Sequence, residues 1–352
     1  METPADADFT KSLPKVELHA HLTGSITPQC LHEIWQKKRS TSTGPRLEDP
    51  ITACRPEAAH HNVLSFFPLF DKYIYNLCND RESISFATEQ VLQAFEDDGV
   101  RYLELRTTPR EAPTTGLTKE TYIETVLETI QTHSKHLMHT FLILSIDRRN
   151  TAEQALIVVH LALKYRSRGI IGIDLCGNPL KGSNSISTFA PAFALAKSHN
   201  LKITLHFAEV PESSTDFELQ TLLSFYPDRI GHVINTPSSI EAEIEKRNLG
   251  LELCLSCNVL ADLTHGGFAN HHFGKWYMRD CPVALCTDDV GVFGSSVSNE
   301  YLLAAQHFQL SRADLIWLAS GAVPSIFGGE DEEDRMYGLL REFELKQKHD
   351  AV

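Results

Sequence analysis

The chain has 352 residues, and 42% of them are hydrophobic, so it can bury a large core and is neither disordered nor fibrous. Its length is compatible with two average domains or with one large α/β barrel. The 46 acidic residues exceed the 32 basic ones and give a net charge of −14, which argues against a protein that binds DNA or RNA, because polyphosphates are bound by basic surfaces.

Short β-rich runs alternate along the chain with helix-length amphipathic segments. Eight runs are predicted as strands: Lys15–His19, Val100–Arg106, Phe141–Asp147, Ile170–Cys176, Leu201–His206, Arg229–Val233, Gly250–Leu255 and Val283–Asp288. The intervening segments, such as 84–95 and 122–130, carry apolar residues at helical spacing. Eight strand–helix repeats without a long linker predict a single (β/α)8 barrel of the TIM type. A doubly wound open sheet is the alternative, but the sequence lacks a glycine-rich phosphate loop.

The connection after the first strand is too long for one helix. This insertion covers about 22–82, with helices predicted around Leu31–Lys38 and Val63–Asn76 and a loop near Ser40–Pro56. In a barrel, an insertion that follows a strand end overhangs the catalytic face. We therefore expect the insertion to be a lid.

Nothing near the first residues is typical of a targeting segment. Residues 1–13 carry acidic side chains and no apolar run, and no stretch approaches the 18 apolar residues of a membrane-spanning helix.

The eight cysteines are dispersed, as is typical of reduced thiols, and the C-x-x-C pair at Cys254 and Cys257 is interpreted as core packing. The acidic run Glu330–Asp334 is interpreted as a solvated connection. We expect one cytosolic domain over 1–352, a monomer without a membrane partner.

The ends of the predicted strands collect residues that bind metals. The first strand ends in His19-Ala20-His21, and residues i and i+2 of a strand point to the same face. His206 ends the fifth strand, and Asp288 ends the eighth. Because C-terminal strand ends meet at one face of a barrel, these residues predict a site for Zn²⁺ or a similar divalent ion. The alternative is that they are ordinary polar residues at strand ends.

The fourth strand bears on the number of metals. Two-metal barrel hydrolases carry a bridging lysine at the end of this strand, whereas the sequence here reads Asp174-Leu175-Cys176-Gly177. We therefore expect one metal per chain.

Three further residues near the same strand ends can take part in proton transfer. Glu209 follows His206 by three residues and is a candidate proton donor. His232 can orient or deprotonate water, and Asp289 can hold the water or a substrate nitrogen. A metal-activated water that attacks an electrophilic carbon, with a carboxylic acid protonating the developing anion, is a coherent hydrolytic mechanism. The alternatives are an exposed loop acid for Glu209 and a core histidine for His232.

Two arginines and two threonines follow the second predicted strand. The segment Leu103–Arg110 places them at the catalytic face, where they would form a clamp for a monophosphate. The alternative is a surface turn, which Thr-Pro and flanking arginines also suit.

Five motifs resemble, in the same order, those of the adenosine/AMP deaminase superfamily: Leu13–Leu22, His206–Glu209, Arg229–His232, Glu252–Asn258 and Cys286–Asp289. The resemblance runs from about residue 11 to about residue 325. It implies a (β/α)8 barrel with one zinc ion that hydrolytically removes an amine from C6 of a purine. The zinc ligands that it implies are His19, His21, His206 and Asp288. It further implies that Glu209 protonates purine N1, that His232 and Asp289 position the attacking water, and that Gly177 hydrogen-bonds the purine.

Within this superfamily the chain is most similar to the subgroup that converts N6-methyl-AMP to IMP and methylamine. Besides Leu103–Arg110, the segments Cys286–Phe293 and His271–Gly274 carry this likeness. Thr23, where an asparagine is expected, and Tyr75, where relatives offer a histidine to the phosphate, depart from the pattern. The substrate contacts expected on this basis are His21, Thr23, Tyr75, Arg106, Thr107, Thr108, Pro109, Arg110, Asp147, Gly177 and Asp289.

Two other functions are compatible with these motifs. An adenosine or adenine deaminase would share the metal chemistry but would have no use for the Arg106–Arg110 cluster. An inactive barrel that binds nucleotides is the non-enzymatic alternative, and the intact ligand set with Glu209 argues against it. Six other histidines, in helical or loop segments away from the strand ends, are expected at solvated positions; they are His60, His61, His133, His136, His139 and His199.

Overall fold

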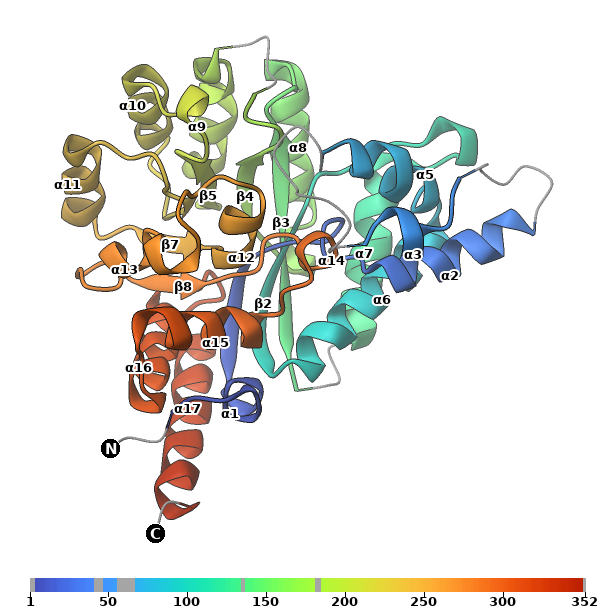
Figure 1. Ribbon diagram of the computed structural model, residues 1–352. Helices are drawn as coiled ribbons and strands as arrows, with labels where there is room; N and C mark the ends of the chain where they lie inside the picture. The colour runs from blue at the N-terminus through green and yellow to red at the C-terminus, as the bar shows by residue number, and fades with distance from the viewer. Residues whose placement is uncertain (1–3, 41–46, 56–66, 134–136, 181–184, 351–352) are drawn as a thin grey trace.

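The computed structural model describes residues 4–40, 47–55, 67–133, 137–180 and 185–350, and its centre is a barrel of parallel strands (Figure 1). Neighbouring strands pair in the order β1 to β8 without a crossover. Their bounds are Lys15–His21 (β1), Val100–Thr107 (β2), His139–Asp147 (β3), Ile170–Cys176 (β4), Lys202–Phe207 (β5), Arg229–His232 (β6), Gly250–Leu253 (β7) and Val283–Leu285 (β8). The predicted barrel is confirmed, and each predicted strand matches an observed one.

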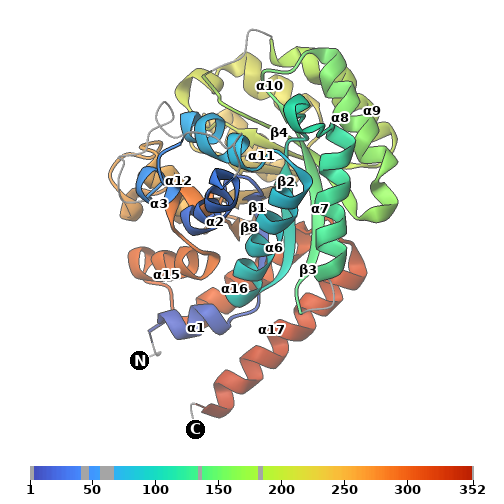
Figure 2. The same ribbon diagram turned by 90° about the vertical axis from the view of Figure 1, so that its right-hand side faces the viewer.

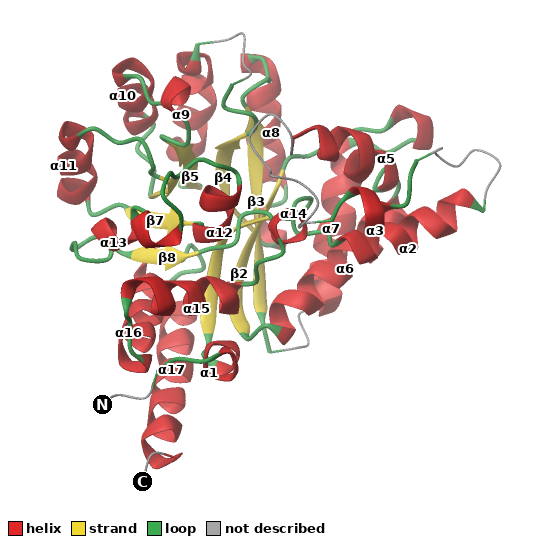
Figure 3. Cartoon of the chain, viewed as in Figure 1, coloured by secondary structure: helices red, strands yellow, loops and turns green. Residues whose placement is uncertain are grey.

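Helices surround the strands and cover the outer face of the barrel (Figures 2 and 3). Helix α8, for example, buries five aliphatic residues over two thirds of its length, while its polar residues face outward. The helix bounds are Ala7–Ser12 (α1), Pro28–Arg39 (α2), Pro50–Ala53 (α3), Tyr75–Leu77 (α5), Arg81–Asp97 (α6), Lys119–His133 (α7), Ala152–Lys164 (α8), Ala190–Ser198 (α9), Asp216–Ser224 (α10), Ser238–Arg247 (α11), Leu255–Leu260 (α12), Phe273–Trp276 (α13), Val290–Phe293 (α14), Val297–Phe308 (α15), Arg312–Ala322 (α16) and Glu330–Asp350 (α17).

The seam between β8 and β1 closes the barrel with few backbone contacts. A single parallel bridge joins Ala20 to Asp288. On its two sides, the amide of His21 donates to the carbonyl of Asp288 at 2.9 Å, and the amide of Asp288 donates to the carbonyl of His19 at 2.8 Å. Strand β8 has only three residues, so the predicted strand Val283–Asp288 is longer than the observed one.

The insertion between β1 and α6 holds α2, α3 and α5, and Figure 1 shows these helices beside α6. The helix predicted around Leu31–Lys38 is α2. The segment predicted as a helix over Val63–Asn76 is described from residue 67 onward, and Phe70–Ile74 within it forms a π-helical turn. The middle of the predicted loop Ser40–Pro56 lies outside the described residues, and the short helix α3 occupies its end.

The acidic run Glu330–Asp334 is not a connection, because it forms the first turn of α17. Acidic residues there stabilise the helix through the partial positive charge of its N-terminus, which explains why the run is helical. Helix α17 packs against α16 and extends away from the barrel (Figure 1). None of the helices in the described part of the chain is long and apolar enough to cross a membrane.

Candidate active site

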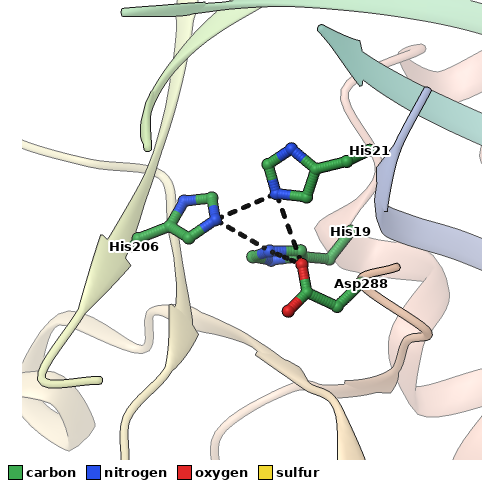
Figure 4. A group of neighbouring side chains, drawn as sticks. All are labelled: His19, His21, His206 and Asp288. Atoms are coloured by element: carbon green, nitrogen blue, oxygen red, sulfur yellow. Dashed lines mark hydrogen bonds and ion pairs between the residues drawn. The ribbon is translucent and has the colours of Figure 1, made fainter. Parts of the chain in front are cut away.

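Three histidines and one aspartate converge at the carboxyl ends of the strands (Figure 4). His19 and His21 come from β1, His206 from β5, and Asp288 follows β8. The Nε2 atom of His206 lies 3.2 Å from that of His19 and 3.0 Å from that of His21. Asp288 Oδ1 lies 3.4 Å and 3.3 Å from the same two atoms of β1. The structure thus brings together the four side chains predicted to bind the metal.

The outer nitrogens of two of these rings show that the donor set fits a metal ion. His19 Nδ1 lies 2.6 Å from Glu252 Oε2, and His206 Nδ1 lies 3.1 Å from Asp174 Oδ1. A carboxylate only accepts hydrogen bonds, so each ring carries a proton on Nδ1, and the neutral form of each ring presents a lone pair at Nε2. Two lone pairs that face each other at 3.2 Å repel unless a cation lies between them. Three nitrogens and one carboxylate oxygen are a set that suits Zn²⁺.

The backbone at the site is unusual at two strand ends. His232 and Asp288 have φ angles of +64° and +62°, in the left-handed region that costs a non-glycine residue about 1–3 kcal/mol. Strain of this kind persists only where the surrounding structure holds it. Close packing also selects glycine at Gly231, because a Cβ there would lie 2.6 Å from Cε1 of His19.

His232 and Asp289 lie beside the four ligands and keep one polar atom unpaired. His232 Nδ1 lies 3.1 Å from Asn258 Oδ1, whereas its Nε2 has no hydrogen-bond partner among the described residues and lies 3.9 Å from Asp288 Oδ2. Burial lowers the pKa of His232, which favours the neutral ring. Burial, followed by the negative charge of Asp288, raises the pKa of Asp289 well above its usual range.

A cavity of about 440 Å³ opens over the metal ligands. Glu209, which is 6% exposed, lies in its wall together with Asp289 and the ligands His21, His206 and Asp288. Five of the other expected substrate contacts line the same cavity: Thr23, Tyr75, Thr108, Asp147 and Gly177. The volume is suitable for a nucleotide-sized molecule.

The profile of the adenosine deaminase family matches residues 14–342. The chain belongs to this family. It is similar to the N6-Methyl-AMP deaminase of Danio rerio, with 38% identity over 99% of each chain, and to the N6-mAMP deaminase of Arabidopsis thaliana, with 35% identity over 92% of this chain and 95% of the relative.

Solved structures of the family superpose closely on the chain. The crystal structure of Arabidopsis N6-mAMP deaminase MAPDA has a TM-score of 0.88 and 35% identity, and the match covers 95% of this chain and 99% of that one. Arabidopsis ADAL complexed with IMP also has a TM-score of 0.88, with 34% identity over 95% of this chain and 98% of the other. The family and the barrel that the five sequence motifs indicated are therefore confirmed.

The predicted phosphate clamp is wrong for Arg106. Its side chain is 0% exposed and lies inside the barrel, where strand alternation points it together with Glu104. Thr107 is also buried and shares a hydrogen bond of 2.6 Å with the hydroxyl of Tyr122. Neither residue lines the cavity above the metal ligands.

Pro109 and Arg110 face a neighbouring cavity instead of the one over the metal ligands. The guanidinium of Arg110 stacks on the Tyr75 ring at 4.1 Å from its centroid and donates to the carbonyl of Cys78 at 3.2 Å. Of the predicted cluster, only Thr108 therefore reaches the main cavity.

Two cations in the cavity wall were not predicted. Lys72 belongs to the π-helical turn, and Arg149 follows β3. Arg149 forms a bidentate pair with Asp147, through Nε to Oδ1 at 2.9 Å and Nη2 to Oδ2 at 2.7 Å. Lys72 gives little signal in the sequence, because a lysine in an amphipathic segment usually lies on a solvated face. Arg149 stands two residues past a predicted strand end, which is a usable signal.

The residues that support the predicted ligands were also not expected from the sequence. These are Asp174 and Glu252, which bind two ligand rings, and Asn258 and His271, which are joined to each other at 3.1 Å and to His232 through Asn258. The available signal was an acid at an inward position of an otherwise apolar strand, as at Asp174 in β4.

One histidine prediction outside the site is also wrong. His133 is 2% exposed, and its ring lies 3.3 Å from Glu89 and 3.2 Å from Glu96 across the α6–α7 contact. His199 is exposed, and His139 is partly exposed with Glu332 at 2.6 Å. The predictions for His60, His61 and His136 fall outside the described residues.

Proposed function

We propose that the chain is a zinc-dependent aminohydrolase that converts N6-methyl-AMP to IMP and methylamine, with one zinc ion per chain. The observation that carries this proposal is the position of Glu209 and Asp289 in the wall of a cavity directly over His21, His206 and Asp288. Relatives named N6-Methyl-AMP deaminase and the ADAL complexes with IMP and GMP support the substrate class.

The ligand set defines what a metal would contribute. A zinc ion bound by the four ligands supplies a Lewis acid that lowers the pKa of water at this position. His19, His21, His206 and Asp288 would hold it. The ring nitrogens are fixed for this role by Glu252 and Asp174, whose carboxylates keep the protons on the far side of two rings.

The remaining side chains would move the protons of the hydrolysis. Because Asn258 Oδ1 accepts from His232 Nδ1, the lone pair at Nε2 can take a proton from the attacking water. The carboxyl of Glu209 would donate a proton to purine N1 as the C6–water bond forms. Asp289 would accept a hydrogen bond from the same water. Cleavage of the C6–N6 bond then releases methylamine, whose nitrogen would take the proton that His232 accepted from water. The hydroxyl at C6 would lose its proton as the carbonyl of IMP forms, and this proton would restore the carboxyl of Glu209.

We further propose that Lys72 and Arg149 bind the phosphate. They are the two cationic side chains among the described residues that line the cavity. Arg149 already forms two hydrogen bonds to Asp147, so a phosphate would add to this pair or displace part of it. Tyr75 lies between the cavity and Arg110 and keeps that guanidinium stacked outside.

A panel of four substrates tests the proposed function. The purified protein is given N6-methyl-AMP, AMP, adenosine or adenine, with and without a chelator, and the 6-oxopurine product and the released amine are measured. We expect the highest kcat/KM with N6-methyl-AMP and loss of turnover with the chelator. A preference for adenosine over both monophosphates would contradict the proposed substrate, and turnover that resists the chelator would contradict the proposed metal.

A further inference from the structure

Arg106 lies inside the barrel below the metal ligands, and the phosphate does not account for it. Its Nη2 donates to Glu252 Oε2 at 2.8 Å and to the carbonyl of Leu18 at 2.6 Å. Its Nη1 lies 3.4 Å from Asp174 Oδ1. One guanidinium therefore reaches two carboxylates that belong to different strands, β7 and β4.

The two oxygens that Arg106 contacts are the same two that hold ligand rings. Glu252 Oε2 lies 2.6 Å from His19 Nδ1, and Asp174 Oδ1 lies 3.1 Å from His206 Nδ1. Each of these oxygens is thus shared between Arg106 and an imidazole. A change in the position of Arg106 would therefore alter the hydrogen bonds that orient both rings.

The other oxygen of each carboxylate is bound elsewhere. Glu252 Oε1 accepts hydrogen bonds from Thr204 Oγ1 at 2.8 Å and from Arg229 Nε at 2.7 Å. Asp174 Oδ2 accepts one from Ser145 Oγ at 2.9 Å. These contacts anchor the carboxylates from behind, and Arg106 sets the direction of the oxygens that face the histidines.

Stability alone does not explain a buried arginine with these contacts. Nε and Nη1 of Arg106 make no hydrogen bond within the described part of the chain. A buried polar group that lacks a hydrogen bond costs stability, and apolar replacements of buried ion pairs are often neutral or stabilising. The contacts of Arg106 therefore point to a function at His19 and His206, which it reaches through Glu252 and Asp174.

We propose that Arg106 is a positioning residue of the metal site: it holds Glu252 and Asp174 so that His19 and His206 keep their Nε2 atoms directed at one ion. The proposal rests on the metal site of the proposed function. It does not depend on the identity of the substrate.

The test is the affinity of the metal-free protein for Zn²⁺, measured by competition with a chromophoric chelator. Arg106→Lys keeps the charge but loses the planar fork, and Arg106→Met keeps much of the volume but loses the charge. We expect both variants to bind zinc about 10- to 100-fold more weakly, as is typical when a partner behind a metal ligand is removed. A merely electrostatic role would give the opposite pattern, because removal of a positive charge would tighten zinc binding in Arg106→Met and leave Arg106→Lys unchanged. That result would overturn the proposal.

A matched control separates positioning from general damage to the core. Lys15 is also a buried basic residue of the barrel, but its Nζ donates to backbone carbonyls, including those of Thr10 and Leu13. Lys15→Met should leave zinc affinity and the absorption spectrum of the Co²⁺-loaded protein unchanged, whereas both Arg106 variants should shift that spectrum. Equal effects in all three variants would contradict a positioning role.

The coupling between Arg106 and each of the two carboxylates can be measured with folded single and double variants. Glu252→Gln and Asp174→Asn should each weaken zinc binding, and each should have a smaller effect when combined with Arg106→Lys. Additive effects would overturn the proposal. If the wild-type protein binds no zinc, the proposed metal site fails; if it binds zinc and the Arg106 variants match it, only the role of Arg106 fails.

Discussion

Glu209 combines three properties that a proton donor at this site needs. It is 6% exposed, it lines the cavity, and it follows the metal ligand His206 by three residues without being part of the four-ligand cluster. Its backbone is fixed because the carbonyl accepts a hydrogen bond from Asn235 Nδ2 at 3.2 Å. The role proposed for it can therefore be separated from metal binding.

We predict that Glu209→Gln lowers kcat on N6-methyl-AMP by about 10²- to 10⁴-fold while the bound zinc stays the same. Gln keeps the volume but cannot give up a proton to the purine. Steady-state kinetics and metal content by atomic emission check both parts. Glu212→Gln, an exposed acid three residues further on, is the control and should have wild-type kcat. Unchanged turnover in Glu209→Gln would remove this residue from the mechanism.

Lys72 and Arg149 lead to a prediction about substrate choice. Lys72→Ala and Arg149→Ala should each raise KM for N6-methyl-AMP by about 10- to 100-fold, since a hydrogen bond to a charged group contributes about 1.5–3 kcal/mol. The kcat/KM for adenosine, which has no phosphate, should change little. Arg110→Ala is the informative comparison, because Arg110 is one of the two arginines expected from the sequence to bind the phosphate. A selective loss in Arg110→Ala alone would place the phosphate next to Tyr75 and Pro109 instead.

At the scale of the elements, the helices α12 and α15 are joined by a buried carboxyl. Glu300, in the first turn of α15, accepts a hydrogen bond from the amide of Ser256 at 3.0 Å and one from the hydroxyl of Ser295. Burial, opposed by these hydrogen bonds, raises the pKa of Glu300 to about 7. An unfolded chain releases this proton near pH 4.5. Between these two values the folded state holds a proton that the unfolded state has lost, so a rise in pH destabilises the fold.

We therefore predict that Glu300→Gln becomes more stable relative to the wild type as pH rises from about 4.5 to about 7, by about 1.4 kcal/mol per pH unit at most. Above that range the difference should level off. Urea unfolding of the metal-loaded protein at several pH values measures it. Glu82, an exposed acid in the first turn of α6, is the matched control, and Glu82→Gln should not reproduce the profile. A difference that is constant with pH would contradict the prediction.

Strands such as β4, Ile170–Cys176, could be predicted because they are buried on both sides and are composed mostly of apolar residues in a short run. The end of β8 was harder to predict from the sequence, since Asp288 belongs to the bridge at the seam and not to a continuous ladder. The convergence of His19, His21, His206 and Asp288 could be predicted because strand ends meet at one face. Arg106 was misplaced for a physical reason: alternation in β2 points it inward with Glu104, although its place at a strand end suggested the surface.

At the scale of the whole molecule, the proposed metal ligands lie on both sides of the seam that closes the barrel. His19 and His21 belong to β1, and Asp288 follows β8, where one bridge and two flanking hydrogen bonds join the strands. A metal bound by these residues would link β1 to β8 more firmly than the backbone does. The contacts between other neighbouring strands are longer ladders, such as the six register pairs between β2 and β3.

We predict that metal removal lowers Tm and selectively loosens this seam. With zinc at about 1,000 times its Kd, the bound state should be about 4 kcal/mol more stable than the metal-free one. Hydrogen exchange read by mass spectrometry should quicken in peptides that contain the amides of His21 and Asp288. Peptides from β3, such as those around Leu142–Leu144, should exchange at a similar rate with and without metal. Equal acceleration across all strands would contradict a local effect at the seam.

The π-helical turn at Phe70–Ile74 determines how the deletion of one residue would change the wall of the cavity. A π-helical turn accommodates one residue more than the α-helical turn it replaces, and residues in an α-helix are about 100° apart around the axis. Loss of one codon here would let the segment become α-helical and rotate Lys72 relative to Tyr75, which directly follows the turn. The metal ligands, which come from β1, β5 and the end of β8, would not move. In the proposed function, a single deletion here would change how the substrate is bound and would leave the proposed metal site in place.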